Sequence, residues 1–108
     1  MVKLNIKPLS VNEAWRGKRF KSHKYNDFEL EMLLLIPKQK IPEGDLEITL
    51  EFGFSNKASD IDNPVKLTLD CLQKKLKFDD KSIYLLHLQK TIVPKGSEFI
   101  KYTIKPTT

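Results

Sequence analysis

Alternating apolar and polar side chains predict four strands along the chain. Residues 2–7 and residues 46–52 both alternate with a period of two, which is typical of a strand with one buried face. Two more strands are predicted at about 83–93 and 98–104. The intervening residues 94–97 contain glycine and are short enough for a hairpin, so we expect the last two strands to be paired.

The first predicted helix covers residues 25–36. Phe28, Met32 and Leu35 recur at helical spacing, and the proline that follows ends the run because it has no amide hydrogen to continue a helix. The preceding residues 10–24 are polar, basic and irregular, so no helix or strand is predicted there.

A second helix is predicted to begin at Asn63 and Pro64, since proline is well tolerated in the first helical turn. We expect Asp62 to cap its N-terminus. The predicted apolar stripe consists of Val65, Leu69, Leu72 and Leu76. Asp62, Lys66 and Asp70 are spaced by four residues, so they share a neighbouring polar stripe at the margin of a cleft.

The order strand, helix, strand, helix, strand, strand predicts an α+β fold. We expect one small domain over residues 1–108, with the helices packed on a mixed or mostly antiparallel sheet. No apolar run approaches the roughly 20 residues that span a bilayer, so no membrane association is expected. The lone cysteine favours a reducing, intracellular setting.

An acidic cluster lies in a protein whose formal net charge is +5. Its members, within 21 residues, are Asp60, Asp62, Lys66, Asp70, Asp79 and Asp80. A basic surface attracts a polyanion, and carboxylates bind hard cations such as Mg²⁺, so the pattern indicates a metal-dependent enzyme that acts on nucleic acid. Asp60 and Asp62 point the same way in extended backbone, and Asp79 or Asp80 can return to them if the next strand runs back.

Lys66 lies one helical turn from Asp62, where it could stabilise charge on the phosphate or on the leaving oxygen. A simpler interpretation stays open, in which these residues form only a capping turn and a solvated loop. An EF-hand is excluded, because Val65 and Cys71 stand where that loop needs glycine and glutamate. A zinc hydrolase is excluded because no histidine lies near the cluster.

A basic and aromatic segment follows the first predicted strand. Its positive charges are Arg16, Lys18, Arg19, Lys21 and Lys24, with Trp15, Phe20 and Tyr25 among them. Lysine and arginine neutralise phosphates, and an aromatic ring can stack on an unpaired base, so we expect DNA contacts here. Lys57 precedes the acidic cluster and is expected to contact the cleaved strand. The alternative is a flexible cationic loop that Trp15 anchors to the core.

The acidic motif resembles that of a known nuclease family. Residues 60–70 read Asp-Ile-Asp-Asn-Pro-Val-Lys-Leu-Thr-Leu-Asp, with an aspartate pair at 79–80, and this pattern resembles the RusA family of Holliday junction resolvases from phages and prophages. Residues 8–20 are similar to the N-terminal segment of that family. The resemblance implies a homodimeric, Mg²⁺-dependent endodeoxyribonuclease that nicks two opposed strands of a four-way DNA junction. It implies that Mn²⁺ can replace Mg²⁺, that no nucleotide cofactor is used, and that the protein acts in the bacterial cytoplasm and could be encoded by a phage.

Motif matching assigns roles to individual residues. The resemblance places the metal-binding catalytic positions at Asp60, Asp62 and Asp80, and the catalytic lysine at Lys66. It gives supporting positions to Asp70, Asp79 and Asn63.

One departure from the family concerns the end of the second predicted helix. Family members often carry a glycine between this helix and the acidic pair, whereas residues 72–78 of this chain contain none. The helix is therefore expected to run longer here. Lys74, Lys75 and Lys77 of this stretch are expected to face DNA.

The leading hypothesis is a dimeric, Mg²⁺-dependent nuclease that resolves Holliday junctions. The rival hypothesis is a non-catalytic module that binds branched DNA on the same scaffold, with carboxylates that only shape the fold. A third is an acidic-site protein unrelated to DNA. A two-fold junction suits a two-fold dimer, and the candidates for its interface are exposed apolar residues on one strand or on the first predicted helix.

Overall fold

The computed structural model describes residues 1–16 and 20–108, and the side chains of residues 1–14 and 22–108. The elements in chain order are β1 (Val2–Leu4), α1 (Val11–Ala14), β2 (Trp15–Arg16), β3 (Phe20–Lys21), α2 (His23–Leu35), β4 (Leu46–Phe54), α3 (Val65–Leu76), the 3₁₀ helix η1 (Asp80–Ser82), β5 (Ile83–Ile92) and β6 (Phe99–Pro106). Among the described helices, none is long and apolar enough to cross a membrane.

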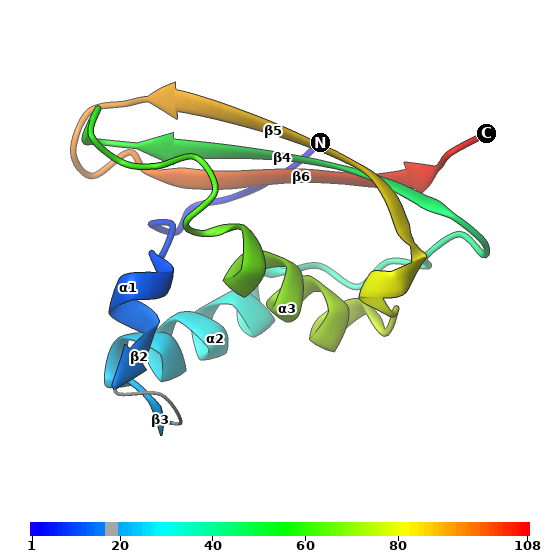
Figure 1. Ribbon diagram of the computed structural model, residues 1–108, viewed down its shortest axis with the longest axis horizontal. Coiled ribbons are helices and arrows are strands. Elements are labelled where there is room, and N and C mark those ends of the chain that lie inside the picture. Colours follow the sequence, from blue (N-terminus) through cyan, green and yellow to red (C-terminus); the bar gives the residue numbers. More distant parts are fainter. Residues whose placement is uncertain (17–19) are drawn as a thin grey trace.

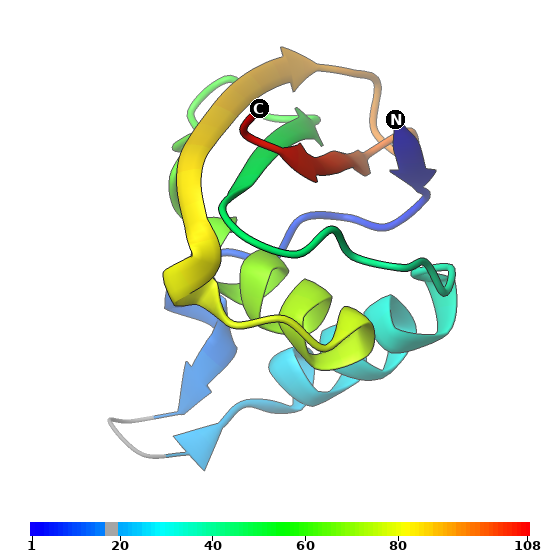
Figure 2. The ribbon, with the colours of Figure 1, turned by 90° about the vertical axis from the view of Figure 1, so that its right-hand side faces the viewer.

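A four-stranded mixed sheet carries helices on one face (Figure 1). Its strand order is β1-β6-β4-β5, with β4 antiparallel to β6 and parallel to β5. Helices α2 and α3 lie side by side beneath the sheet, and α1 leads into the small β2/β3 ribbon at one end of this layer (Figures 1 and 2). The predicted α+β class and the order of its main elements are confirmed, whereas α1, β2, β3 and η1 were not predicted.

Strand β4 lies at the centre of the core. Its buried alternate side chains are Leu46, Ile48, Leu50 and Phe52. These side chains face the helices, while Glu47 and Glu51 point to the opposite face of the sheet because successive strand residues alternate. Each fully buried side chain of this size contributes about 1.5–3 kcal/mol to folding, so β4 anchors the helical layer to the sheet.

The predicted pairing of the last two strands is wrong. Strands β5 and β6 run in opposite directions, but β4 lies between them in the sheet. Helix α3 forms a crossover that returns β5 parallel to β4, and the connection to β6 then passes the end of β4. There the N–H of Val93 donates to the Phe54 carbonyl at 2.8 Å, and Gly96 turns the chain with a φ of 95°.

Helix α2 begins at His23, two residues before the predicted start. The reason is Ser22, whose hydroxyl oxygen accepts a hydrogen bond from the N–H of Tyr25 at 3.2 Å and caps the first turn. The buried face consists of Tyr25, Phe28 and Met32. Leu35, which was predicted on the apolar stripe, is 39% exposed.

Helix α3 differs from the prediction at its start and in its buried face. Pro64 occupies the N-cap position without a side-chain cap bond, so the expected cap by Asp62 is wrong. The buried residues are Leu67, Thr68, Cys71, Leu72 and Leu76. Val65 and Leu69 are only half-buried, because the buried face of the helix is centred nearer Thr68 and Cys71 than the predicted stripe is.

The end of α3 has a backbone conformation that favours glycine. Lys77 has a φ of 61° and a ψ of 53°, and its N–H donates to the Gln73 carbonyl at 2.9 Å. The left-handed region is unfavourable for a residue with a Cβ atom and natural for glycine. Lys77 lies within residues 72–78, where members of the family that the sequence resembles often carry a glycine.

We predict that Lys77→Gly raises the free energy of unfolding by about 1 kcal/mol, because it relieves the left-handed strain. Lys77→Ala is the matched control, since it removes the same charge but keeps the Cβ atom. Urea unfolding of both variants and the parent measures the difference. A glycine variant no more stable than the alanine variant would show that this position carries no strain.

Candidate functional site

The acidic turn, residues 60–64, leads into α3. The N–H of Asn63 donates to the Asp60 carbonyl at 3.4 Å, and the N–H of Val65 donates to the Asp62 carbonyl at 3.2 Å. The Asn63 side-chain amide also donates to the Asp60 carboxylate at 3.5 Å. These bonds order the backbone of the turn while Asp60 and Asp62 stay exposed. Asn63 thus contacts Asp60, and its supporting role in a site stays a prediction.

The carboxylate of Asp62 is not used by the helix cap. Pro64 holds the cap position, and in the described part of the chain no hydrogen bond or ion pair involves the Asp62 side chain. It lies just before the N-terminus of α3, where the helix dipole favours a negative charge. The residue is therefore placed to donate oxygen ligands to a cation near Asp60.

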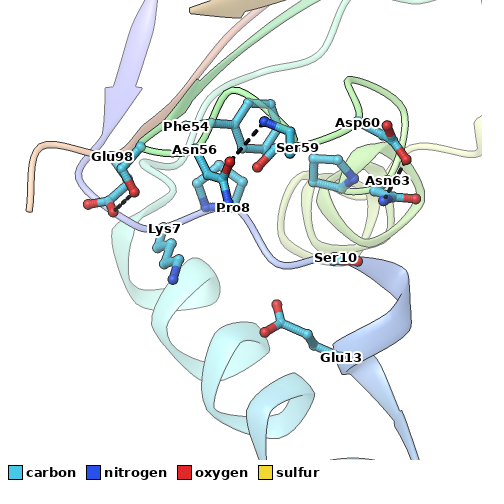
Figure 3. A pocket seen from close by; sticks show the side chains of 13 residues that line it. Lys7, Pro8, Ser10, Glu13, Phe54, Asn56, Ser59, Asp60, Asn63 and Glu98 are labelled. Carbon is cyan, nitrogen blue, oxygen red and sulfur yellow. Dashed lines mark hydrogen bonds between the residues drawn. The ribbon is translucent and has the colours of Figure 1, made fainter. Parts of the chain in front are cut away.

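The acidic turn lies against the N-terminal segment of the chain. The N–H of Val11, the first residue of α1, donates to the Asn63 carbonyl at 3.3 Å. A pocket of about 310 Å³ lies between the two segments (Figure 3). Its ionisable lining residues are Lys7, Glu13, Asp60 and Glu98. The two regions that carry the family resemblance therefore meet in space at one edge of this pocket.

Lys7, Glu13 and Glu98 were not singled out from the sequence. Glu13 lies within the segment that resembles the family, so that resemblance was the one available signal for it. Its carboxylate forms an ion pair with Lys24 at 3.3 Å. Lys24 was one of the residues predicted to contact DNA. Nothing in the local pattern around Lys7 or Glu98 marks either residue, because the pocket joins segments far apart in the chain.

Glu98 is held in its ionised form beside the pocket. The Ser55 hydroxyl and the N–H of Gly96 both donate to its carboxylate at 2.8 Å. The Ser55 bond is the first reason why the pKa of Glu98 lies below its ordinary value. Three carboxylates, those of Asp60, Glu98 and Glu13, and one cation, Lys7, line the pocket, so its ionisable lining is mainly acidic and disfavours a phosphate.

Lys66 and Asp70 form an ion pair on the exposed side of α3. The ammonium of Lys66 lies 3.3 Å from the Asp70 carboxylate, and the two side chains are 72% and 36% exposed. Such an exposed pair contributes only about 0.3–0.5 kcal/mol, so Lys66 can exchange Asp70 for a phosphate. Burial, followed by the charge of Asp70, raises the pKa of Tyr25 to about 12. Asp70 therefore supports the position of Lys66 and lies near α2.

The second acidic pair lies after the C-terminus of α3. Asp79 caps η1, since its carboxylate accepts a hydrogen bond from the N–H of Lys81 at 3.0 Å. That bond is the main reason why the pKa of Asp79 lies below its ordinary value, and the Asp80 side chain is the next contribution. The N–H of Asp80 donates to the Gln73 side chain at 3.0 Å, which ties Asp80 to the last turn of α3. With Asp79 engaged as a cap, Asp80 is the member of the pair suited to bind a cation.

The acidic turn and Asp80 lie at opposite ends of α3 (Figure 1). A helix of 12 residues is about 18 Å long at 1.5 Å per residue. Among the described residues no three histidine, cysteine, aspartate or glutamate side chains are close enough to hold a metal ion. One chain therefore does not bring Asp60, Asp62 and Asp80 together. The following strand does run back, but the acidic pair precedes it and stays at the far end.

Lys90, near the end of β5, contacts the loop that precedes the acidic turn. Its ammonium donates to the Lys57 carbonyl at 2.8 Å and also to the Ser59 carbonyl. The Lys90 stem passes Phe54, with its nitrogen 5.9 Å from the ring centre. Lys90 thus fixes the loop that leads into the acidic turn, while the side chain of Lys57 stays exposed. Sequence reasoning missed Lys90, because its partners are backbone carbonyls of a distant loop.

Two lysines that were predicted to face DNA join α3 to α2. Lys74 forms an ion pair with Glu29 at 2.9 Å, and the hydrogen bond within this pair raises the pKa of Lys74. The ammonium of Lys75 donates to the Leu33 carbonyl at 2.6 Å, near the end of α2. These contacts give both residues a structural role. DNA contact by Lys77, which is exposed, stays a prediction.

The basic segment is only partly described. Its short strands β2 and β3 lie side by side (Figure 2). They pair antiparallel, with Trp15 opposite Lys21 and Arg16 opposite Phe20. Lys18 and Arg19 lie outside the described residues, as do the side chains of Arg16 and Lys21. DNA contact by these four residues stays a prediction.

Exposed carboxylates and a nearby lysine are residue types that metal-dependent hydrolases of phosphodiesters use, but the fold class alone does not define a function. The model of the family "Endodeoxyribonuclease RusA" matches residues 6–101. Since this match covers most of the 108 residues, the chain belongs to the RusA endodeoxyribonuclease family. No curated protein matches the chain closely enough to count as a relative.

We predict that Lys90→Met loosens residues 55–60 without unfolding the domain, because it removes two hydrogen bonds and keeps the aliphatic stem. The expected cost in unfolding free energy is about 1 kcal/mol. Hydrogen–deuterium exchange should become faster in this loop while β4 and β6 stay protected.

Lys95→Met is the matched control, since Lys95 is exposed and close in sequence. It should leave exchange in the loop unchanged. Unaltered exchange in Lys90→Met would show that the lysine does not hold the loop.

Proposed function

We propose that this protein is a homodimeric, Mg²⁺-dependent endodeoxyribonuclease that resolves Holliday junctions by paired nicks in opposed strands. The observation that carries the proposal is the acidic turn. Its backbone is ordered by hydrogen bonds, its Asp60 and Asp62 side chains are exposed, and neither carboxylate caps α3. Membership of the RusA endodeoxyribonuclease family supports the reaction class. The setting would be the bacterial cytoplasm, with either a host or a phage gene as the source.

Within one chain, only two of the three proposed carboxylates lie close enough together to bind a hard divalent cation. Asp60 and Asp62 offer carboxylate oxygens from one turn, which is the ligand type that Mg²⁺ or Mn²⁺ prefers. Asp80 lies beyond the far end of α3, so we assign the third carboxylate to Asp80 of the partner subunit. The chemistry that such a cation supplies is polarisation of the phosphate and activation of the attacking water. No nucleotide cofactor is needed for this reaction.

The chain itself would orient the substrate and balance charge. Lys66, one turn into α3, would leave its weak pair with Asp70 and place its ammonium against the phosphate or the leaving oxygen. Lys57 is exposed on the loop that Lys90 holds beside the acidic turn, where it would contact the cleaved strand. The net charge of +5 favours a polyanionic partner, and its attraction to DNA would weaken as salt rises.

A four-way junction is the substrate that suits a two-fold dimer. Two related active sites can act on two opposed strands of a junction that has the same symmetry. The β2/β3 ribbon, with its basic residues, would contact the arms beside each site.

A second candidate function is a non-catalytic module that binds branched DNA. The separation of Asp80 from the acidic turn within one chain favours it, because an isolated subunit lacks a complete set of ligands. Such a module would bind junctions in a salt-sensitive way and would produce no nicks with Mg²⁺.

We predict that Asp62→Asn abolishes Mg²⁺-dependent nicking of a labelled four-way junction and preserves junction binding, because it keeps the shape and removes one metal-binding charge. Cleavage on denaturing gels and binding by gel shift without divalent cation measure the two effects separately. Loss of one charge-assisted ligand should cost about 2–4 kcal/mol of transition-state stabilisation.

Asp45→Asn is the matched control, since Asp45 is an exposed aspartate outside the acidic turn. It should nick at the parental rate. Parental cleavage by Asp62→Asn would exclude the catalytic assignment, and absence of Mg²⁺-dependent nicks in the parent would favour the non-catalytic module.

A further inference from the structure

The face of the sheet opposite the described helices carries a cluster of two lysines and one phenylalanine (Figure 1). Lys3, Phe99 and Lys101 point to this face, because Leu4 and Ile100, the next residues along their strands, are buried in the core on the other face. Lys3 lies directly opposite Lys101 in the antiparallel pair of β1 and β6. These three residues are called the open-face cluster below.

Gly53 makes room for the ring of Phe99. The two residues lie opposite each other on β4 and β6. A Cβ atom at position 53 would lie 2.4 Å from two ring carbons of Phe99, so a larger residue would displace the ring. Glycine weakens the interior of a strand and often marks a place where another group approaches closely. The ring is only 5% exposed although it lies outside the buried core, so the groups around it cover most of its surface.

Two positive charges lie against this ring. The ammonium nitrogen of Lys3 is 5.0 Å from the ring centre of Phe99, and that of Lys101 is 5.2 Å from it. An ammonium group is attracted to the negative face of an aromatic ring. Like charges directly opposite each other on paired strands are unfavourable. The ring therefore holds close together two ammonium groups that repel each other.

No carboxylate neutralises these two charges. Neither lysine of the cluster forms an ion pair with any residue that the structure describes. Glu51 lies opposite Lys101 on β4, but its carboxylate accepts hydrogen bonds from Thr91 at 2.7 Å and from Gln89 at 3.4 Å, both on β5. The open-face cluster therefore keeps two uncompensated positive charges near one point, which favours the binding of an anion.

The open-face cluster lies at the end of the sheet that carries the acidic turn. Phe99 directly follows Glu98, which lines the pocket on the side opposite Asp60 (Figure 3). The hydrogen bond from Ser55 to Glu98 joins the end of β4 to the start of β6 at this point. Lys95 is exposed on the loop before β6. The acidic turn and the open-face cluster are thus on two sides of one pocket.

We propose that the open-face cluster binds the backbone phosphates of DNA that extends from the acidic turn, over this end of the sheet, onto the open face. The acidic pocket disfavours phosphate, so the cluster offers the next phosphate contact beyond it. Contacts to phosphate position DNA without reading its sequence, so the cluster fixes the direction in which an arm leaves the site. The identity of the anion as DNA rests on the proposed function, whereas the attraction of the cluster for phosphate does not.

The test removes both charges and keeps the aliphatic stems that cover Phe99. We predict that Lys3→Met combined with Lys101→Met weakens binding of a labelled four-way junction about tenfold, because fewer counterions are released from the DNA. The slope of log K against log salt should become smaller by about 1 for each lost phosphate contact. Gel shifts without divalent cation, over a range of salt concentrations, measure both quantities. Circular dichroism checks the fold, and Lys101→Met alone is the second variant if the double variant does not fold.

Two further double variants control for charge and for position. Lys3→Arg with Lys101→Arg keeps both charges and should bind as the parent does. Lys38→Met with Lys40→Met removes two exposed lysines from the loop that leads into β4, and it should keep the parental salt slope. An equal loss of affinity and slope in both methionine double variants would show that only net charge matters, and it would overturn the open-face site.

The outcomes separate this inference from the proposed function. Parental affinity and slope in the variant without Lys3 and Lys101 would overturn the DNA contact, whether or not the parent nicks junctions. Titration with inorganic phosphate, followed by NMR, identifies the other source of the anion. Shifts in β1 and β6 that need both lysines, together with unchanged junction binding, would assign a free phosphate and also overturn the DNA contact. Weakened junction binding by this variant, with a parent that never nicks DNA, would uphold the cluster and refute the nuclease.

Discussion

Helix α3 fixes which acidic side chains of this protein can act together. Its 12 residues separate the acidic turn from Asp80, and the bond from the N–H of Asp80 to Gln73 holds that residue on the last turn. Burial of Leu67, Cys71 and Leu72 ties the helix to the core, so its ends cannot approach each other in the folded chain. Any site that uses carboxylates from both ends requires a second subunit.

The crossover through α3 also fixes the direction of β5. It returns β5 parallel to β4, from the Asp80 end of the molecule to the end that carries the acidic turn. Lys90 then binds the loop before that turn, so the open strand edge spans the distance between the two halves of the motif. The same connection therefore separates the carboxylates within one chain and joins the two ends of the molecule through β5.

The periodicity of the sequence predicted the class and order of the fold because β4 alternates strictly and α2 has a clear apolar spacing. It could not predict that β4 separates β5 from β6, since a short loop is compatible with a hairpin and with a connection past one strand. The cap by Asp62 was wrong because Pro64 took that position. The roles of Lys75 and Lys90 depend on carbonyls of distant segments and leave no local signal. The motif singled out the acidic residues as candidates, but a linear motif contains no information on how far apart the fold places them.

Subunit mixing tests the proposed assignment of Asp80 to the site of the partner subunit most directly. Asp62→Asn and Asp80→Asn are each expected to be inactive, because every site of either dimer lacks one carboxylate. A mixed dimer would carry both substitutions in one site and none in the other. We predict that unfolding and refolding the two variants together restores Mg²⁺-dependent nicking of a four-way junction, with one strand cut per mixed dimer. A refolded mixture as inactive as either variant, in the presence of proven mixed dimers, would place Asp62 and Asp80 in the site of one subunit.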